Sequence, residues 1–448
     1  MKVLGALFLT LSAATPASSV FIIVPDVLAE AGTGALIAMG LAAVIALCIS
    51  QVYAELGSAF PLAGGEYAIV ARTLGPLAGF AVLGVNLFNS VLTAAVLALG
   101  LAQYVLPGDP GLAVPIALAA VGGSTLLALL NIRTNAVVTG LFVGVELLAL
   151  TVLFVLGVLH PARNLGAVLA HPVMASGASL APVGPAAIGL AVAVAVFAYD
   201  GYGSALYFGE EMHEAPSRIG RAITWAVLIT VAAEILPLGA VIGGAPKLGP
   251  LLRSTFAFGD FIRWTGGGVL ERVVMAGVAL AIFNAVIATI LLTSRQLYGT
   301  GGDRTWPGGL NQAMAALHPK FHSPWLAALV AGLLASALCF LDLKLLLIAT
   351  GTGVTVIYGF ICVAVLVGRR SKRTAHGRYR LPFFPLVPIF ALAALAGVIW
   401  SDWVDPAEGR PGLFITLGVI GASCLYYLVA IRPWRRWPAS VEAALAPE

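Results

Sequence analysis

Three acidic residues lie inside stretches of the chain that are otherwise almost wholly apolar: Asp200, Glu146 and Glu234. An ionised carboxylate in such surroundings costs several kcal/mol unless water, a cation or a hydrogen-bond donor meets it. Burial therefore favours the protonated form, whereas a bound cation favours the ionised form. One carboxylate can in this way exchange a proton for a cation. We predict this chemistry at Asp200, with Glu146 and Glu234 as further proton-coupling residues.

Two of these acids also have a purely structural interpretation, which the sequence leaves open. Asp is a favoured residue at the start of a helix, so Asp200 could simply cap the helix that follows it. Glu146 could be a protonated side chain that hydrogen-bonds between two helices.

The composition indicates whether these residues lie in a soluble protein or in a membrane protein. The chain has 448 residues, of which 60% are hydrophobic and 10% are charged. Soluble proteins carry roughly 25% charged residues, because polar side chains must cover their surface. This composition argues against a soluble enzyme and predicts an all-α polytopic membrane protein.

Apolar windows long enough to cross a bilayer recur along the whole chain. A membrane-crossing helix needs roughly 20 predominantly apolar residues. The intervals between such windows are short, so we predict a single transmembrane domain over 1–448 without a separate soluble domain. Twelve transmembrane helices are expected, over approximately 4–30, 33–57, 75–106, 111–131, 136–159, 185–212, 219–243, 268–297, 324–341, 345–367, 382–401 and 411–431.

The amino-terminal segment resembles a signal peptide, with Lys2 followed by an apolar run to Ala14. The apolar pattern continues to Leu28, however, so we interpret the segment as an interrupted membrane helix.

The basic residues predict the orientation in the membrane. Seventeen of the 24 Lys and Arg residues fall at the termini and in the loops of the same side, and seven fall in the loops of the other side. Because basic residues concentrate in cytoplasmic loops, both termini should be cytoplasmic, in a plasma or bacterial inner membrane. The basic cluster at 369–380 fits topological anchoring, with an anionic-lipid site as the alternative.

Two of the expected helices contain residues that break a helix. The first carries the run 15–19 with Pro16, and the sixth carries the run 199–204 with Gly201 and Gly203. Proline removes a backbone donor and glycines favour unwinding, so each segment should split into two half-helices. Irregular backbone inside a membrane is tolerated where protein or a water-filled cavity surrounds it. Ordinary kinks are the alternative interpretation.

The two broken helices are the first of two sets of five. Five is an odd number, so the second set would run upside down relative to the first. Broken helices at corresponding positions of inverted repeats indicate the binding site of a transporter. We predict repeats over 4–160 and 185–367, with extra helices over 382–431.

Aromatic and amide side chains near the breaks could complete a binding site. Phe197 and Tyr202 flank Asp200, where a ring could cover a bound ammonium group, although single aromatic residues in membrane helices usually serve packing. The predicted substrate-binding residues are Thr15, Pro16, Ala17, Ser18, Ser19, Phe197, Ala198, Tyr199, Asp200, Gly201, Tyr202, Asn86 and Asn284.

Other chemistry is not indicated. The four cysteines, at 48, 339, 362 and 424, lie in apolar spans and fit buried hydrophobic residues rather than disulfides or metal ligands. No cofactor, metal site or nucleic-acid partner is predicted, and with no cysteine in an external loop we expect no disulfide-linked partner subunit. The sequence contains no hydrolase triad or phosphate-binding loop.

Several motifs resemble a known family. The runs 53–57 (YAELG), 61–67 (PLAGGEY) and 75–80 (GPLAGF) are similar to a signature of the amino acid-polyamine-organocation superfamily. A second match joins 197–202 (FAYDGY) to 210–216 (EEMHEAP), and a third covers 294–298 (SRQLY). The resemblance implies a LeuT-like fold of five plus five helices with two additional helices, alternating access, and an amino acid or amine substrate.

The sequence departs from the family pattern at two places. The usual Gly-Ser-Gly of helix one is Ala17-Ser18-Ser19, which leaves less room for a substrate carboxylate. Many members have a lysine near the position of Glu146, where it stands in for a bound sodium ion. A carboxylate there inverts the charge and could bind a proton or a cation.

These observations predict a secondary transporter of amino acids or related amines. Asp200 favours a cationic amino acid or polyamine, and a neutral amino acid permease is the alternative, ahead of a channel or sensor on the same fold. Protons are preferred to sodium as the coupling ion, because 279–288 in the eighth span contains no hydroxyl residue before Thr289.

Overall fold

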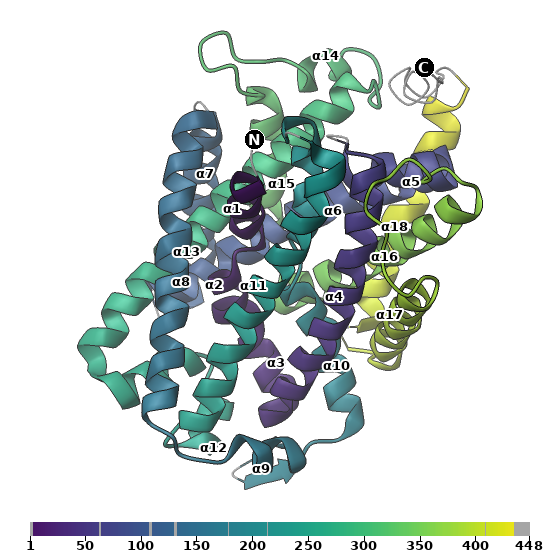
Figure 1. Ribbon diagram of the computed structural model, residues 1–448. Coiled ribbons are helices and arrows are strands. Elements are labelled where there is room, and N and C mark those ends of the chain that lie inside the picture. Colours follow the sequence, from purple (N-terminus) through teal and green to yellow (C-terminus); the bar gives the residue numbers. More distant parts are fainter. Residues whose placement is uncertain are drawn as a thin grey trace.

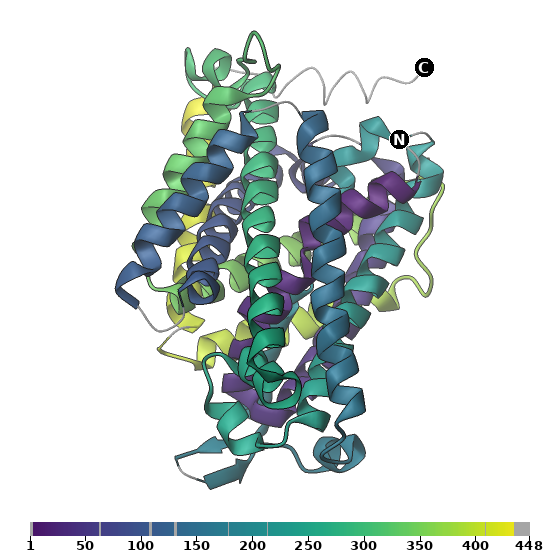
Figure 2. The ribbon, with the colours of Figure 1, turned by 90° about the vertical axis from the view of Figure 1, so that its left-hand side faces the viewer.

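The protein, seen here as a computed structural model, is a bundle of long helices that lie side by side (Figures 1 and 2). Helix α1 begins and α18 ends toward the same end of the bundle, which we call the terminal end. The structure describes residues 3–61, 64–106, 110–129, 132–177, 179–212, 214–407 and 409–433. Residues 62, 63 and 213, which belong to the sequence motifs, lie outside this set.

The secondary structure is almost entirely helical. Its elements are α1 Val3–Ala14, α2 Pro16–Ser18, η1 Ser19–Ile23, α3 Val24–Ala31, η2 Gly32–Gly34, α4 Ala35–Ala59, α5 Gly65–Leu74, α6 Pro76–Val105, η3 Pro110–Leu112, α7 Ala113–Ala128, α8 Ile132–Leu159, α9 Leu165–Ala170, β1 Val173–Ser176, β2 Ser179–Pro182, α10 Pro185–Ala198, η4 Tyr202–Glu211, α11 Ala215–Gly244, α12 Leu248–Arg253, α13 Ala257–Gly302, α14 Leu310–Met314, α15 Trp325–Leu338, α16 Leu343–Arg370, α17 Leu386–Val404, α18 Gly409–Tyr426 and η5 Tyr427–Ile431.

The long helices agree with a membrane protein. Within the described ranges, nine segments are long and apolar enough to cross a bilayer, and α7 and α15 are shorter apolar helices. Their outward side chains are apolar as well, for example Leu141 at 71% and Leu333 at 72% exposure. Lipid, which does not penalise exposed apolar surface, explains this pattern.

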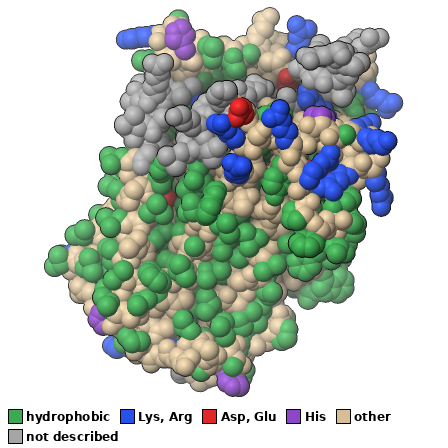
Figure 3. All heavy atoms as spheres, in the orientation of Figure 1, with side chains coloured by type: hydrophobic (Ala, Val, Ile, Leu, Met, Phe, Trp, Pro, Cys, Tyr) green, Lys and Arg blue, Asp and Glu red, His purple; other side chains and the backbone are tan. Residues whose placement is uncertain are grey.

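The charged side chains are unevenly distributed over the surface. On the face shown in Figure 3, Lys and Arg side chains gather toward the terminal end, and hydrophobic side chains cover most of the remainder. This pattern is the three-dimensional counterpart of the charge bias in the loops.

The first broken helix is interrupted at a single residue. Helix α1 ends at Ala14, Thr15 adopts a left-handed conformation with φ 43° and ψ 63°, and α2 begins at Pro16. Proline disfavours helical geometry in the residue before it and suits the first turn of a new helix, so the break falls at Thr15. The non-helical part of the first helix is therefore shorter than the run 15–19. Helical structure resumes at Pro16 and continues through η1, which is a π-helix with wider turns than an α-helix.

The second broken helix opens at the expected place and touches the first. Helix α10 ends at Ala198, and η4 starts at Tyr202. Gly201 between them has φ 113°, and a Cβ atom on it would lie 2.5 Å from the Cα atom of Ala14. The Ser19 hydroxyl donates a hydrogen bond of 2.9 Å to the Ala198 carbonyl oxygen. Glycine is therefore required where the two breaks meet.

A short hairpin covers the end of the bundle opposite the terminal end (Figure 2). Strands β1 and β2 pair antiparallel, with Val173 opposite Pro182. The backbone N–H of Val173 donates to the Thr33 hydroxyl at 2.8 Å, which ties the hairpin to the helix pair α3 and α4.

Candidate functional site

A cavity lies beside the second break, in the half of the bundle toward the terminal end. It measures about 120 Å³, whereas one water molecule needs roughly 10–15 Å³, so it can hold several waters or a small polar group. Helices α4, α5, α6, α13 and α16 and the segment around η4 enclose it. The lining includes Ala13, Tyr53, Glu66, Asn86, Asn89, Ser90, Asp200, Gly201, Gly203, Ser204, Tyr207, Thr289, Gln296 and Tyr358.

Asp200 is the charged residue that the second break presents to this cavity. Its neighbours Tyr199 and Tyr202 are 0% and 1% exposed, whereas Asp200 remains partly exposed. The Tyr358 hydroxyl donates a 2.7 Å hydrogen bond to Asp200 Oδ1. A carboxylate that faces water on one side and a phenol on the other can release and accept a proton.

Three tyrosine rings form the wall around this carboxylate. Tyr53, Tyr202 and Tyr358 pack with ring centroids 5.8–5.9 Å apart, two pairs edge to face and one pair stacked. Tyr202, which the sequence suggested as a lid over an ammonium group, is therefore part of a packed aromatic cluster. Phe197, the second suggested ring, is also buried.

A second carboxylate, Glu66, lines the same cavity. Its Oε2 atom accepts hydrogen bonds from the Tyr207 hydroxyl at 2.5 Å and from Asn86 Nδ2 at 3.1 Å. Gln296 Nε2 donates to the Tyr207 oxygen at 3.2 Å, and Ser90 donates to Gln296 Oε1 at 2.9 Å. The network joins α5, α6, η4 and α13.

The predicted substrate residues divide into two groups. Asp200, Gly201 and Asn86 line the cavity together with Ala13, next to the first break. The others are packed in the interior: Pro16, Ala17, Ser18 and Ser19 are buried, as are Thr15, Ala198, Tyr199 and Asn284. The side-chain amide of Asn284 has no hydrogen-bond partner among the described residues.

The other two predicted coupling residues flank the first break. Glu146 on α8 lies beside the backbone of Ala17, and Glu234 on α11 lies beside the Ser19 hydroxyl. Both side chains are 0% exposed. Within the described part of the chain, neither carboxylate has a hydrogen-bond partner of normal geometry. Two buried glutamates without such partners are suited to a protonated, uncharged state.

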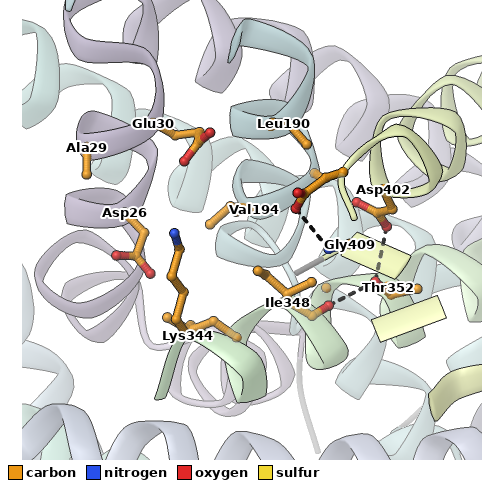
Figure 4. Close-up of a pocket in the computed structure, with 14 residues that line it drawn as sticks. Asp26, Ala29, Glu30, Leu190, Val194, Lys344, Ile348, Thr352, Asp402 and Gly409 are labelled. Carbon is orange, nitrogen blue, oxygen red and sulfur yellow. Dashed lines mark hydrogen bonds between the residues drawn. The ribbon is translucent and has the colours of Figure 1, made fainter. Parts of the chain in front are cut away.

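A second cavity, of about 170 Å³, lies between α3, α10, α16 and α17. Figure 4 shows Lys344 pointing toward the carboxylates of Asp26 and Glu30. Asp402, on the opposite wall, accepts a 3.1 Å hydrogen bond from the Thr352 hydroxyl. No residue of either break lines this cavity, so the terminal-end cavity is the stronger candidate for the site.

The sequence as a whole identifies the family. A model of the amino acid permease family matches residues 1–431. The chain belongs to this family of amino acid permeases. Its relatives are transporters rather than enzymes.

Individual relatives of this permease cover most of its length. An uncharacterized transporter of Mycobacterium tuberculosis is 30% identical over 376 residues, which are 82% of this chain and 78% of the relative. The branched-chain amino acid permease BcaP of Lactococcus lactis is 26% identical over 92% of this chain and 91% of its own length. The serine/threonine exchanger SteT of Bacillus subtilis is 24% identical over 95% and 96%.

Sequence reasoning about the permease missed Glu66, Tyr207, Tyr358 and Gln296 as parts of the site. Glu66 could have been predicted from the sequence, because it is an acidic residue in the PLAGGEY motif. That motif was used only as a mark of the family resemblance. Tyr358 gave no such signal, since a single aromatic residue in an apolar span usually serves packing. Among the described residues, no group of three His, Cys, Asp or Glu side chains could hold a metal ion.

Proposed function

We propose that this permease is a secondary transporter that moves a small amino acid or amine through the cavity beside Asp200 by alternating access, with protons as the coupling ion. The observation that carries the proposal is the position of Asp200. It lies at the helix break, it faces the cavity, and its Oδ1 atom already has one donor in Tyr358 at 2.7 Å. An ammonium group or a proton can bind the part of the carboxylate that faces the cavity.

The charge balance of the cavity supports a cationic ligand. Two carboxylates, Asp200 and Glu66, line it, and no Lys or Arg is among its described lining residues. Negative charge without a fixed counter-charge favours protons or an organic cation at this place. We therefore favour a cationic amino acid or polyamine as the substrate.

A neutral amino acid is the second candidate, supported by the relatives. BcaP is named for branched-chain amino acids and SteT for serine and threonine. In that case the substrate ammonium group, or a proton alone, would neutralise Asp200, and the substrate side chain would be uncharged.

Glu146 and Glu234 are proposed as the proton-carrying residues at the first break. Each is buried beside the part of the first helix that follows the break at Thr15, Glu146 at Ala17 and Glu234 at Ser19. Loss of a proton would leave an unpaired buried charge there, which the fold could tolerate only by opening the break to water or a cation. Protonation of these side chains would thus be linked to movement of the first helix.

The membrane arrangement that we propose has twelve crossings and cytoplasmic termini. Its support is the basic surface toward the terminal end and the helices found over each of the twelve expected ranges. The repeats would span 4–160 and 185–367, with 382–431 added outside them. On this arrangement the cavity beside Asp200 opens toward the cytoplasm and the cavity beside Lys344 lies on the outer side.

Uptake into liposomes tests the function. Purified protein is reconstituted, and uptake of labelled arginine, putrescine, alanine and leucine is measured with and without an inward proton gradient. We expect saturable uptake that the gradient stimulates for one of these compounds and that Asp200→Asn abolishes.

The matched control is Asp405→Asn, which removes a carboxylate that lines only the other cavity. Uptake by Asp200→Asn at the wild-type rate would contradict the assignment of Asp200. Unsaturable flux that unlabelled compound on the other side does not stimulate would indicate a channel.

A further inference from the structure

Glu66 shares the cavity with Asp200 but belongs to another element. It is the second residue of α5, it is 6% exposed, and the segment 64–67 inserts it between α6 and η4. Its two oxygen atoms have different surroundings. Oε2 accepts hydrogen bonds from Tyr207 and Asn86, and the backbone N–H of Glu66 also donates to the carboxylate. Oε1 points toward Gly203, where a Cβ atom would lie only 3.0 Å away.

This difference determines which oxygen atom can carry a proton. A proton on Oε2 would compete with two donors that already occupy that atom. A proton on Oε1 leaves both hydrogen bonds in place and can be donated into the cavity. Glycine at position 203 permits this close approach, since a Cβ atom there would lie 2.7 Å from Tyr53 Cε1 and 3.0 Å from Oε1, and both Gly203 and Glu66 line the cavity.

The two carboxylates affect each other through this space. Burial raises the pKa of Glu66, and the hydrogen bonds from Tyr207, from its own backbone N–H and from Asn86 oppose that change, whereas the charge of Asp200 raises the pKa further. Ionisation of one acid therefore disfavours ionisation of the other. The titratable groups that face Glu66 are Asp200, Tyr53 and Tyr207, and none of them is a cation at neutral pH.

We propose that Glu66 is the second proton acceptor of the transport site. When the ammonium group of a substrate binds Asp200, the proton of the Asp200 carboxyl group passes through cavity water to Glu66 Oε1. The Asp200 carboxylate then pairs with the ammonium group, and Glu66 becomes a neutral acid that still accepts from Tyr207 and Asn86. The inference rests on the proposed function and assigns the route by which the proton leaves that site.

The same residue links the proton to η4, the helix that follows the second break. Tyr207 belongs to η4, directly after the second break, and its hydroxyl donates to Glu66 and accepts from Gln296 on α13. A neutral Glu66 holds Tyr207 less tightly than a carboxylate does, because charge-assisted hydrogen bonds are the stronger ones. Protonation of Glu66 would therefore loosen η4 from α5 on the terminal-end side.

Transport by reconstituted protein tests the proposal, with labelled arginine, putrescine, alanine and leucine as the compounds. The proteins compared are wild type, Glu66→Gln, Glu66→Asp and Asp200→Asn. One assay measures exchange at equal pH on both sides, which requires no net proton movement. The other measures accumulation driven by a proton gradient. We expect Glu66→Gln to lose at least about tenfold more of the accumulation than of the exchange, because exchange needs no net proton movement. Glu66→Asp should retain part of the accumulation. Glu214→Gln is the control, because it removes an exposed carboxylate at the same end of the bundle.

Each other result overturns part of the assignment. If Glu66→Gln accumulates substrate at the wild-type level, Glu66 is not part of the proton route. If both Glu66 variants lose exchange and accumulation equally, the role of Glu66 is structural. A wild type that exchanges but ignores the gradient overturns proton coupling and the role of Glu66 together. A wild type that transports none of the four compounds contradicts the proposed function and, with it, the role of Glu66 in transport.

An infrared measurement on the purified protein tests Glu66 without any substrate. Difference spectra between about pH 5 and about pH 8 report carboxylic acids that lose a proton. Wild type should show a band that Glu66→Gln lacks and that Asp200→Asn shifts. Identical spectra of wild type and Glu66→Gln would overturn the proposal.

Discussion

Arg369 and Glu55 form a two-point ion pair although 314 positions separate them in the chain. Arg369 Nε and Nη2 lie 2.7 Å and 2.6 Å from the two carboxylate oxygens of Glu55, which is fully buried. The backbone N–H of Leu381 also donates to Glu55 at 2.9 Å. This carboxylate joins α4 to the end of α16 and to the connection that follows it.

Glu55→Gln should destabilise the permease. Loss of the charge leaves Arg369 without its buried partner, and breaking a buried pair costs about 3–5 kcal/mol. Arg369 is 21% exposed, so water offsets part of this cost and we expect about 3 kcal/mol. Thermal unfolding in detergent should show a lower midpoint. The double variant Glu55→Met with Arg369→Met should be more stable than either single variant. An unchanged midpoint in Glu55→Gln would contradict this account.

Gly201→Ala should separate the two broken helices. The added Cβ atom would lie 2.5 Å from Ala14 Cα, and φ 113° is unfavourable for alanine. Each effect costs about 1–3 kcal/mol, so uptake of the transported compound should fall strongly. Gly359→Ala on α16 is the control, since nothing lies within 4 Å of a Cβ atom there. Equal uptake by both variants would refute the close approach of the two breaks.

Tyr358→Phe should weaken the step that needs ionised Asp200. The substitution removes the 2.7 Å hydrogen bond and keeps the ring in the aromatic cluster. A hydrogen bond to a charged group contributes about 1.5–3 kcal/mol, which corresponds to roughly 10–100-fold in rate or affinity. Initial rates over a range of substrate concentrations measure the effect. Tyr298→Phe, at a position that is 37% exposed, should behave as wild type.

The stability of the permease should fall with rising pH through Glu66. Burial raises the pKa of Glu66 above its ordinary value of 4.5, so the folded state binds a proton that the unfolded state has already lost. The favourable contribution of the neutral acid is complete below 4.5 and is lost as the pH rises through the higher pKa of the folded state. Thermal midpoints of wild type minus those of Glu66→Gln should therefore decrease over this window. A difference that does not vary with pH would show that Glu66 does not titrate there.

The sequence alone was sufficient for the class of the protein and for the location of its two breaks. A lipid bilayer requires long apolar helices whose backbone N–H and C=O groups are hydrogen-bonded within the helix. Such a helix is a local structure, so it can be recognised in a window of about 20 residues. Pro16 restricts the backbone of the residue before it and Gly201 frees its own backbone, so their effects are local as well. The family membership predicted from the motifs is confirmed by the match over residues 1–431.

The tertiary structure decided which side chains share the cavity. Asp200, Glu66 and Tyr358 come from three elements that are far apart in the chain, and only the packing of α5 and α16 against the second break brings them together. It also decided that Ala17, Ser18 and Ser19 are packed in the interior, because the first helix resumes directly at Pro16. Contacts between distant segments depend on how many helices pack at once, and no local pattern of residues encodes that.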